Sequence, residues 1–96
     1  MTLAWAWDAL GFVDSALGEP RQAMSCYRQA LAFARKRQNS LARRMLVIIL
    51  AEFGDACRAA GDLPAAALAW QEALQILHDQ RLPDALGIRA RLEQSG

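Results

Sequence analysis

The feature that most constrains this chain is an internal repeat. At an offset of 43 residues the small residues of the sequence coincide in five pairs, which are Gly11 with Gly54, Ala16 with Ala59, Gly18 with Gly61, Ala23 with Ala66, and Ala30 with Ala73. A large aromatic residue also recurs, because Tyr27 coincides with Trp70. Small residues let two helices approach closely, and an aromatic side chain fills the space between them. The repeat therefore predicts two similar pairs of antiparallel helices.

Glycine and proline divide the chain into five predicted helices. Gly18 ends one helix and Pro20 begins the next, since glycine favours the position after a helix and proline its first turn. Gly61 and Pro64 repeat this arrangement. The predicted helices cover residues 2–17, 20–37, 40–60, 63–79 and 83–94. No segment alternates apolar and polar residues as a strand does, so the predicted fold class is all-α.

Composition excludes several classes of protein. The 96 residues carry 11 basic and 10 acidic side chains, and a net charge of +1 argues against a dedicated nucleic-acid binder. An apolar content of 54% excludes intrinsic disorder. Two cysteines and one histidine are too few for a four-ligand zinc site without carboxylates, so no metal or cofactor is expected.

The same composition suggests a location for the chain. No apolar run approaches the roughly 20 residues of a membrane span, and no basic segment precedes the apolar N-terminus as in a secretory signal. We therefore expect a cytoplasmic protein without a membrane partner. In a reducing compartment Cys26 and Cys57 should be free thiols.

The repeated residues resemble the tetratricopeptide repeat, whose pattern places small and aromatic residues at fixed spacings. One copy consists of Trp7, Leu10, Gly11, Gly18, Ala23, Tyr27 and Ala30. The second consists of Leu50, Phe53, Gly54, Gly61, Ala66, Trp70 and Ala73. The chain departs from the pattern at Asp14 and Cys57, where tyrosine is preferred, and in lacking the proline that often ends a repeat. Its 43-residue period also exceeds the usual 34 or so, which makes the repeats elongated.

This resemblance implies one domain, 1–96, folded as a right-handed α-solenoid. Repeat 1 spans about 4–37, repeat 2 about 40–79, and a capping helix about 83–94. The last 28 residues resemble the end of the repeat arrays attached to actinobacterial transcriptional regulators and NTPase switches. The implied function is protein–protein interaction within a bacterial regulatory protein, with a protein or peptide partner and no enzymatic activity. The alternative is a regulator domain that senses a signalling peptide or a small molecule.

The resemblance also indicates where a partner would bind. In this family the first helix of each pair lines a concave surface, and solenoids bind their partners on such surfaces. The groove-facing candidates are Trp5, Asp8, Phe12 and Ser15 in the first helix, and Ile48, Ala51, Asp55, Arg58 and Ala59 in the third. The family's peptide mode that clamps a C-terminal carboxylate is not expected, because Asp8, Phe12 and Asp55 stand where such a clamp needs cations or amides.

A basic cluster lies at the predicted turn between the second and third helices. It consists of Arg35, Lys36, Arg37, Arg43 and Arg44. One interpretation is a solvated elbow, since cations at a helix C-terminus complement the helix dipole. The other is contact with an acidic partner or a phosphate backbone, and Arg43 and Arg44 favour it because they oppose the dipole at the start of their helix.

Catalytic patterns are not visible in the sequence. His78 is the only histidine and falls in the last turn of the fourth predicted helix, where its cation would be stabilised at the surface. A nucleophile elbow such as G-x-S-x-G is missing. The glycines are isolated and do not form a phosphate-binding loop.

The two ends of the predicted array differ. The last helix has a polar face and should cap the fourth helix, as terminal repeats do. The first carries Leu3, Trp5 and Trp7 with no preceding repeat to cover them. Either an upstream helix covers this face in a longer chain, or another chain does. For the isolated chain we expect a homodimer built around the first helix, because a two-fold contact needs only one self-complementary patch.

Overall fold

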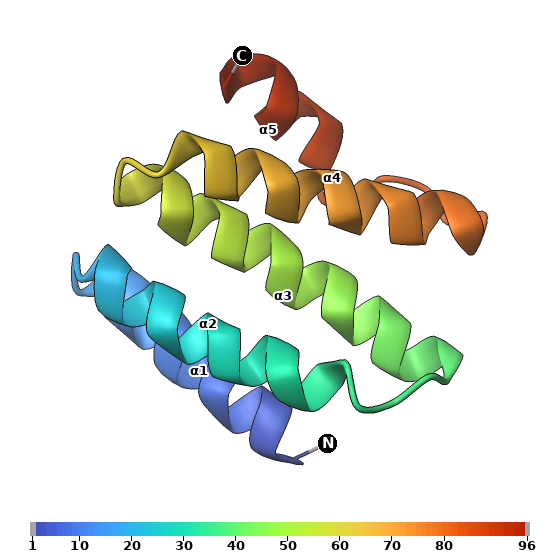
Figure 1. Cartoon of the computed structure of the whole chain (residues 1–96), viewed down its shortest axis with the longest axis horizontal. Helices are drawn as coiled ribbons and strands as arrows, with labels where there is room; N and C mark the ends of the chain where they lie inside the picture. Colours follow the sequence, from blue (N-terminus) through green and yellow to red (C-terminus); the bar gives the residue numbers. More distant parts are fainter. Residues whose placement is uncertain (1, 96) are drawn as a thin grey trace.

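The computed structural model in Figure 1 describes residues 2–95 and confirms the all-α fold class. The helices are α1 (Thr2–Ala16), α2 (Pro20–Ala34), α3 (Ser40–Ala59), α4 (Leu63–Asp79) and α5 (Ile88–Ser95). Within these described residues there is no strand. The first four helices lie where the sequence predicts them, although α2 ends at Ala34 instead of continuing to Arg37.

The helices form two hairpins that lie side by side. α1 packs along α2 and α3 packs along α4, while α2 contacts α3 and joins the hairpins. In Figure 1 the chain proceeds from α1 and α2 at one end of the molecule to α5 at the other. The helices together measure 33 × 33 × 18 Å, so the molecule is a thin slab.

Glycine sets the distance between the helices of each hairpin. A Cβ atom placed on Gly11 would lie 2.8 Å from the ring of Tyr27, and one placed on Gly54 would lie 2.2 Å from Nε1 of Trp70. Both aromatic side chains are buried. The prediction that small residues permit close approach while an aromatic residue fills the gap is therefore confirmed in both hairpins.

The two hairpin turns are also alike. Gly18 has a φ of +77° and Gly61 a φ of +86°, a conformation that glycine adopts without steric cost. After α1, the amide of Glu19 donates to the carbonyl of Asp14 at 2.8 Å; after α3, the amide of Asp62 donates to that of Cys57 at the same distance. Such six-residue bonds define the Schellman motif, which satisfies the last carbonyls of a helix.

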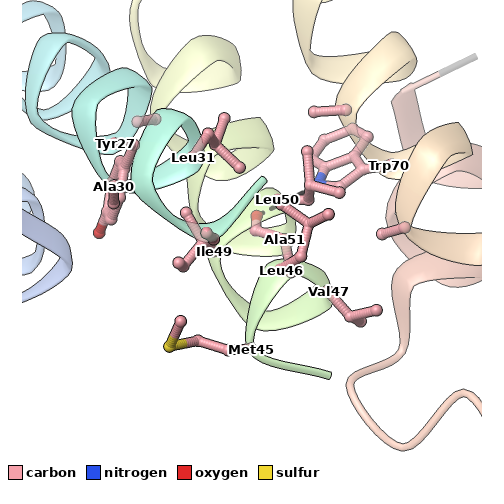
Figure 2. Packing of buried hydrophobic residues seen from close by; sticks show 14 of the residues in the cluster. Tyr27, Ala30, Leu31, Met45, Leu46, Val47, Ile49, Leu50, Ala51 and Trp70 are labelled. Atoms are coloured by element: carbon pink, nitrogen blue, oxygen red, sulfur yellow. Dashed lines mark hydrogen bonds between the residues drawn. The ribbon is translucent and has the colours of Figure 1, made fainter. Parts of the chain in front are cut away.

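The core gathers around α3, which is buried on two sides. Figure 2 shows Leu50 and Ala51 beside Trp70 of α4, and Ile49 toward α2. The indole Nε1 of Trp70 donates a hydrogen bond to the Ala51 carbonyl at 3.3 Å. Because the indole is fully buried, this bond satisfies a donor that would otherwise be costly.

The predicted start of the last helix at Pro83 is wrong, since α5 begins at Ile88. The carboxylate of Asp84 accepts hydrogen bonds from the amides of Ile88 at 2.8 Å and Arg89 at 2.9 Å. When an aspartate side chain accepts hydrogen bonds from amides that follow it in the sequence, the helix begins at those amides and not at the aspartate. Gly87, with a φ of +68°, adds a turn. The shortened α5 still covers α4, because Ile88 is fully buried while Arg89, Glu93 and Gln94 are exposed.

Candidate functional site

The predicted groove residues of α1 divide into accessible and buried positions. Trp5, Phe12 and Ser15 are exposed, as a partner-binding residue must be. Asp8 is only 8% exposed and points into the protein. The expectation that Asp8 lines an accessible groove is therefore corrected, because a buried carboxyl cannot meet a partner at the surface.

Asp8 faces the half-buried carboxyl of Glu52 on α3. One oxygen of each group, Oδ1 of Asp8 and Oε2 of Glu52, is inaccessible to solvent and has no hydrogen-bond donor within reach. Burial, followed by interaction with Asp8, raises the pKa of Glu52 to about 8. Burial and the nearby Glu52 also raise the pKa of the Tyr27 hydroxyl. At neutral pH the Glu52 carboxyl therefore favours its protonated form.

Sequence reasoning missed Glu52 as the partner of Asp8. The repeat offset aligns Glu52 with Ala9 instead of Asp8, so comparison of the two copies hides the pair. The available signal was that each carboxyl adjoins an apolar stretch, Asp8 in the first helix and Glu52 directly after Ala51. Only the packing of α1 against α3 brings the two groups together.

The predicted groove residues of α3 carry ion pairs. Asp55 Oδ1 accepts from Nε of Arg91 at 2.8 Å and lies 4.0 Å from Nη2 of Arg58. The guanidinium of Arg58 also lies over the Trp70 ring, 5.4 Å from its centroid. Arg91 belongs to α5, a contact that the sequence did not predict. Asp55 is therefore already paired with arginine side chains before any partner binds.

The remaining α3 candidates differ in accessibility. Ile48 and Ala59 are exposed, whereas Ala51 is buried in the core and accepts the Trp70 hydrogen bond. The expectation that Ala51 lines the groove is thus also corrected. Beside Ile48 lies an open, mainly apolar pocket of about 220 Å³, lined also by Leu77 of α4 and by Pro83, Ala85 and Leu86 of the segment that precedes α5. Ligand pockets are commonly about 300–1,000 Å³, so this pocket is small for a drug-sized ligand.

The basic cluster between α2 and α3 is neutralised in part. Arg35 makes a two-bond ion pair with Glu72 of α4, with Nη2 2.9 Å from Oε1. The Lys36 ammonium lies 4.9 Å from the centre of the Phe33 ring. Arg37 and Arg43 line a cavity together with two carboxylates, Glu72 and Asp79. Arg44 stands apart beside the apolar pocket next to Ile48. The mixed charges favour the solvated elbow over a phosphate site.

The groups with potential chemistry are dispersed. His78 is exposed in the last turn of α4. Cys26 and Cys57 are free; burial raises the pKa of both thiols, that of Cys57 to about 11, which makes them weak nucleophiles at neutral pH. Across residues 2–95, no three His, Cys, Asp or Glu side chains are arranged to hold a metal ion.

None of the helices formed by residues 2–95 is long and apolar enough to cross a membrane. Comparison with protein-family models, with curated proteins and with solved structures finds no match to this chain. Any function must therefore be argued from the surface of the molecule itself.

Proposed function

We propose that this chain is a protein–protein interaction module of the tetratricopeptide type, a short right-handed solenoid that binds a protein or peptide segment across α1 and α3. Its place would be within a bacterial regulatory protein, as the resemblance of its sequence implies. The module holds its partner by surface contacts and carries out no chemistry of its own.

One observation carries this proposal: α1 and α3 lie next to each other and expose equivalent positions. The 43-residue offset pairs Trp5 with Ile48, Phe12 with Asp55, and Ser15 with Arg58. All of these except the half-buried Asp55 are exposed, and α1 contacts α3 directly. Equivalent faces of neighbouring helices form one continuous strip, which is how stacked repeats build a binding surface.

The strip favours a particular kind of partner. Its α1 part is apolar, because Trp5 and Phe12 offer large aromatic surfaces, and such residues dominate binding energies at interfaces. Its α3 part offers Arg58 as the exposed cation, since Asp55 is engaged by Arg91. We therefore expect a segment with apolar side chains against α1 and an acidic side chain near Arg58.

A displayed library of random peptides, selected on the intact chain, tests this proposal. Selected peptides should combine apolar residues with an acidic neighbour, and Phe12→Ser should raise their Kd about tenfold or more, as expected for loss of one aromatic anchor. Leu68→Ser is the matched control, because Leu68 is as exposed as Phe12 but lies on α4, outside the strip. Equal losses in both variants, or no selectable peptide, would contradict the proposal.

Salt dependence separates the strip from the basic elbow. Affinity for an apolar strip should change little between low and moderate salt, whereas binding of phosphates by several arginines weakens steeply. Arg43→Glu should therefore leave peptide affinity unchanged. A strong loss in that variant would move the site to the elbow.

A further inference from the structure

The apolar pocket beside Ile48 is built by the late start of α5. At the 43-residue offset, Leu86 and Gly87 correspond to Arg43 and Arg44, which are already helical in α3. The segment before α5 is not helical, because the Asp84 carboxylate accepts hydrogen bonds from the first amides of α5. A turn of helix is thus replaced by a loop, whose residues form one wall of the pocket. All lining residues fall between positions 44 and 86, so neither end of the chain shapes it.

The pocket offers apolar surface to a ligand. Val47 of α3 and Leu77 of α4 are buried beneath it, and the exposed side chains of Ile48 and Leu86 lie around its opening. Its volume of about 220 Å³ equals that of roughly seven water molecules, at about 30 Å³ each. The side chain of leucine, isoleucine or methionine therefore fits, whereas the indole ring of tryptophan is too large.

Arg44 is the one charged residue that lines this pocket. Among residues 2–95 the arginines that form ion pairs are Arg35, Arg58 and Arg91, so Arg44 has no acidic partner. The nearest carboxylate in sequence on the opposite wall, that of Asp84, is occupied by the amides that it caps. Arg44 also lies near the start of α3, where the helix dipole disfavours a cation. The fold therefore leaves its charge available to an anionic group.

The pocket continues the proposed binding strip. Ile48 belongs to both, and Arg44 lies one helical turn before Ile48, on the same side of α3. A segment that lies along the α3 part of the strip reaches the pocket without leaving this helix. The distance along α3 from Arg58 to Arg44 is about 21 Å, which an extended chain spans with about six residues.

We propose that the pocket receives an aliphatic side chain of the partner peptide, and that Arg44 pairs with an acidic side chain two positions away from it. Side chains two positions apart in an extended segment point to the same side and lie about 7 Å apart. An aliphatic group thus enters the pocket while the carboxylate meets the guanidinium beside it. This inference rests on the proposed function, because the peptide is the one bound by the strip.

Variants of the pocket test the inference with peptides selected on the intact chain. Ala85→Trp should raise their Kd about tenfold or more, because the indole fills the pocket and excludes the aliphatic side chain. Ala90→Trp is the matched control, since Ala90 is also exposed but lies on α5 outside the pocket. Arg44→Glu should raise Kd about fivefold, whereas Arg43→Glu should not change it. Circular dichroism verifies that each variant stays helical.

A defined probe tests the pocket without a selected peptide. Acetyl-Leu-Ala-Asp-amide at millimolar concentrations should shift the NMR amide signals of Val47, Ile48 and Leu86. Acetyl-Ala-Ala-Asp-amide and acetyl-Leu-Ala-Asn-amide, which lack the aliphatic or the acidic group, should bind more weakly.

The two experiments separate the pocket from the strip. A probe that shifts none of these signals overturns the inference, as do selected peptides that bind Ala85→Trp and Arg44→Glu as tightly as the wild type. In the latter case the strip stands without the pocket. Binding of the probe when no peptide can be selected would support the pocket and contradict the strip.

Discussion

Replacing Gly54 with alanine tests the close approach of α3 and α4 most directly. The added methyl group would start 2.2 Å from Nε1 of Trp70, well inside van der Waals contact. Trp70 cannot turn away, because it is fully buried and its Nε1 donates to the Ala51 carbonyl of the helix that carries Gly54. The two helices must therefore separate, or the indole must leave its place.

The expected change in the free energy of unfolding is the difference between one stabilising effect and two destabilising ones. Alanine is favoured over glycine within a helix by about 1 kcal/mol. Overpacking of a core costs about 1–3 kcal/mol, and losing the indole hydrogen bond costs about 1 kcal/mol more. The net loss in the free energy of unfolding should be about 2 kcal/mol, which lowers Tm by roughly 8–16 °C for a domain of this size. Gly11→Ala should cost less, since its Cβ would start farther from the Tyr27 ring, at 2.8 Å.

Urea unfolding followed by far-ultraviolet circular dichroism measures these differences. Ala32→Gly, at an exposed position inside α2, isolates the helix-propensity effect, and should cost about 1 kcal/mol. In a Trp70→Phe background the penalty of Gly54→Ala should shrink, because phenylalanine lacks the indole nitrogen that meets the new methyl group. A Gly54→Ala protein as stable as the wild type, or more stable, would refute the packing argument.

Three further variants test other parts of the fold. Glu52→Gln should stabilise the protein increasingly as the pH rises. Folding raises the pKa of Glu52 from its ordinary 4.5 to about 8, so between these two pH values the folded state holds a proton that the unfolded state has lost. The stability of the wild type therefore falls between pH 4.5 and 8, whereas glutamine has no proton to lose in this range. A rise in pKa from 4.5 to about 8 corresponds to at most about 5 kcal/mol, and solvent screening of the half-buried carboxyl lowers the expected gain to the order of 2 kcal/mol at pH 8. Urea midpoints whose difference is constant with pH would contradict it. Arg81→Gly should stabilise by about 0.5–1 kcal/mol, because Arg81 adopts a φ of +55° after α4 where the equivalent turns have glycine; thermal unfolding should show a higher Tm, and a lower one would count against the strain. Asp84→Ala should cost about 1 kcal/mol by removing the cap of α5, and amide hydrogen exchange should quicken in α5 but not in α2.

The sequence by itself determined the helices and the way they pair within each hairpin. Helix ends depend on local chemistry, so Gly18 and Gly61 could be recognised as turn positions, and the proline after each marks the next helix. The contact between Gly54 and Trp70 could be anticipated as well, because the Gly11 and Tyr27 pair repeats it at the same spacing. The helix ends depend on residues that are neighbours in the sequence, and the Gly–aromatic contacts depend on the repeat, so the sequence alone indicates both.

Only the tertiary structure decided which side of each helix meets another element. The burial of Asp8 against Glu52 and the ion pair of Asp55 with Arg91 depend on how α1, α3 and α5 are placed around one another. The late start of α5 is a different case, because the hydrogen bonds from the amides of Ile88 and Arg89 to the Asp84 carboxylate are local, so the sequence contained the signal for it. The exposure of Leu10, against the partial burial of its counterpart Phe53, again depends on the placement of the helices. Two helices with equivalent sequences differ in burial because a neighbouring helix covers one and not the other, and that is a property of the assembled chain.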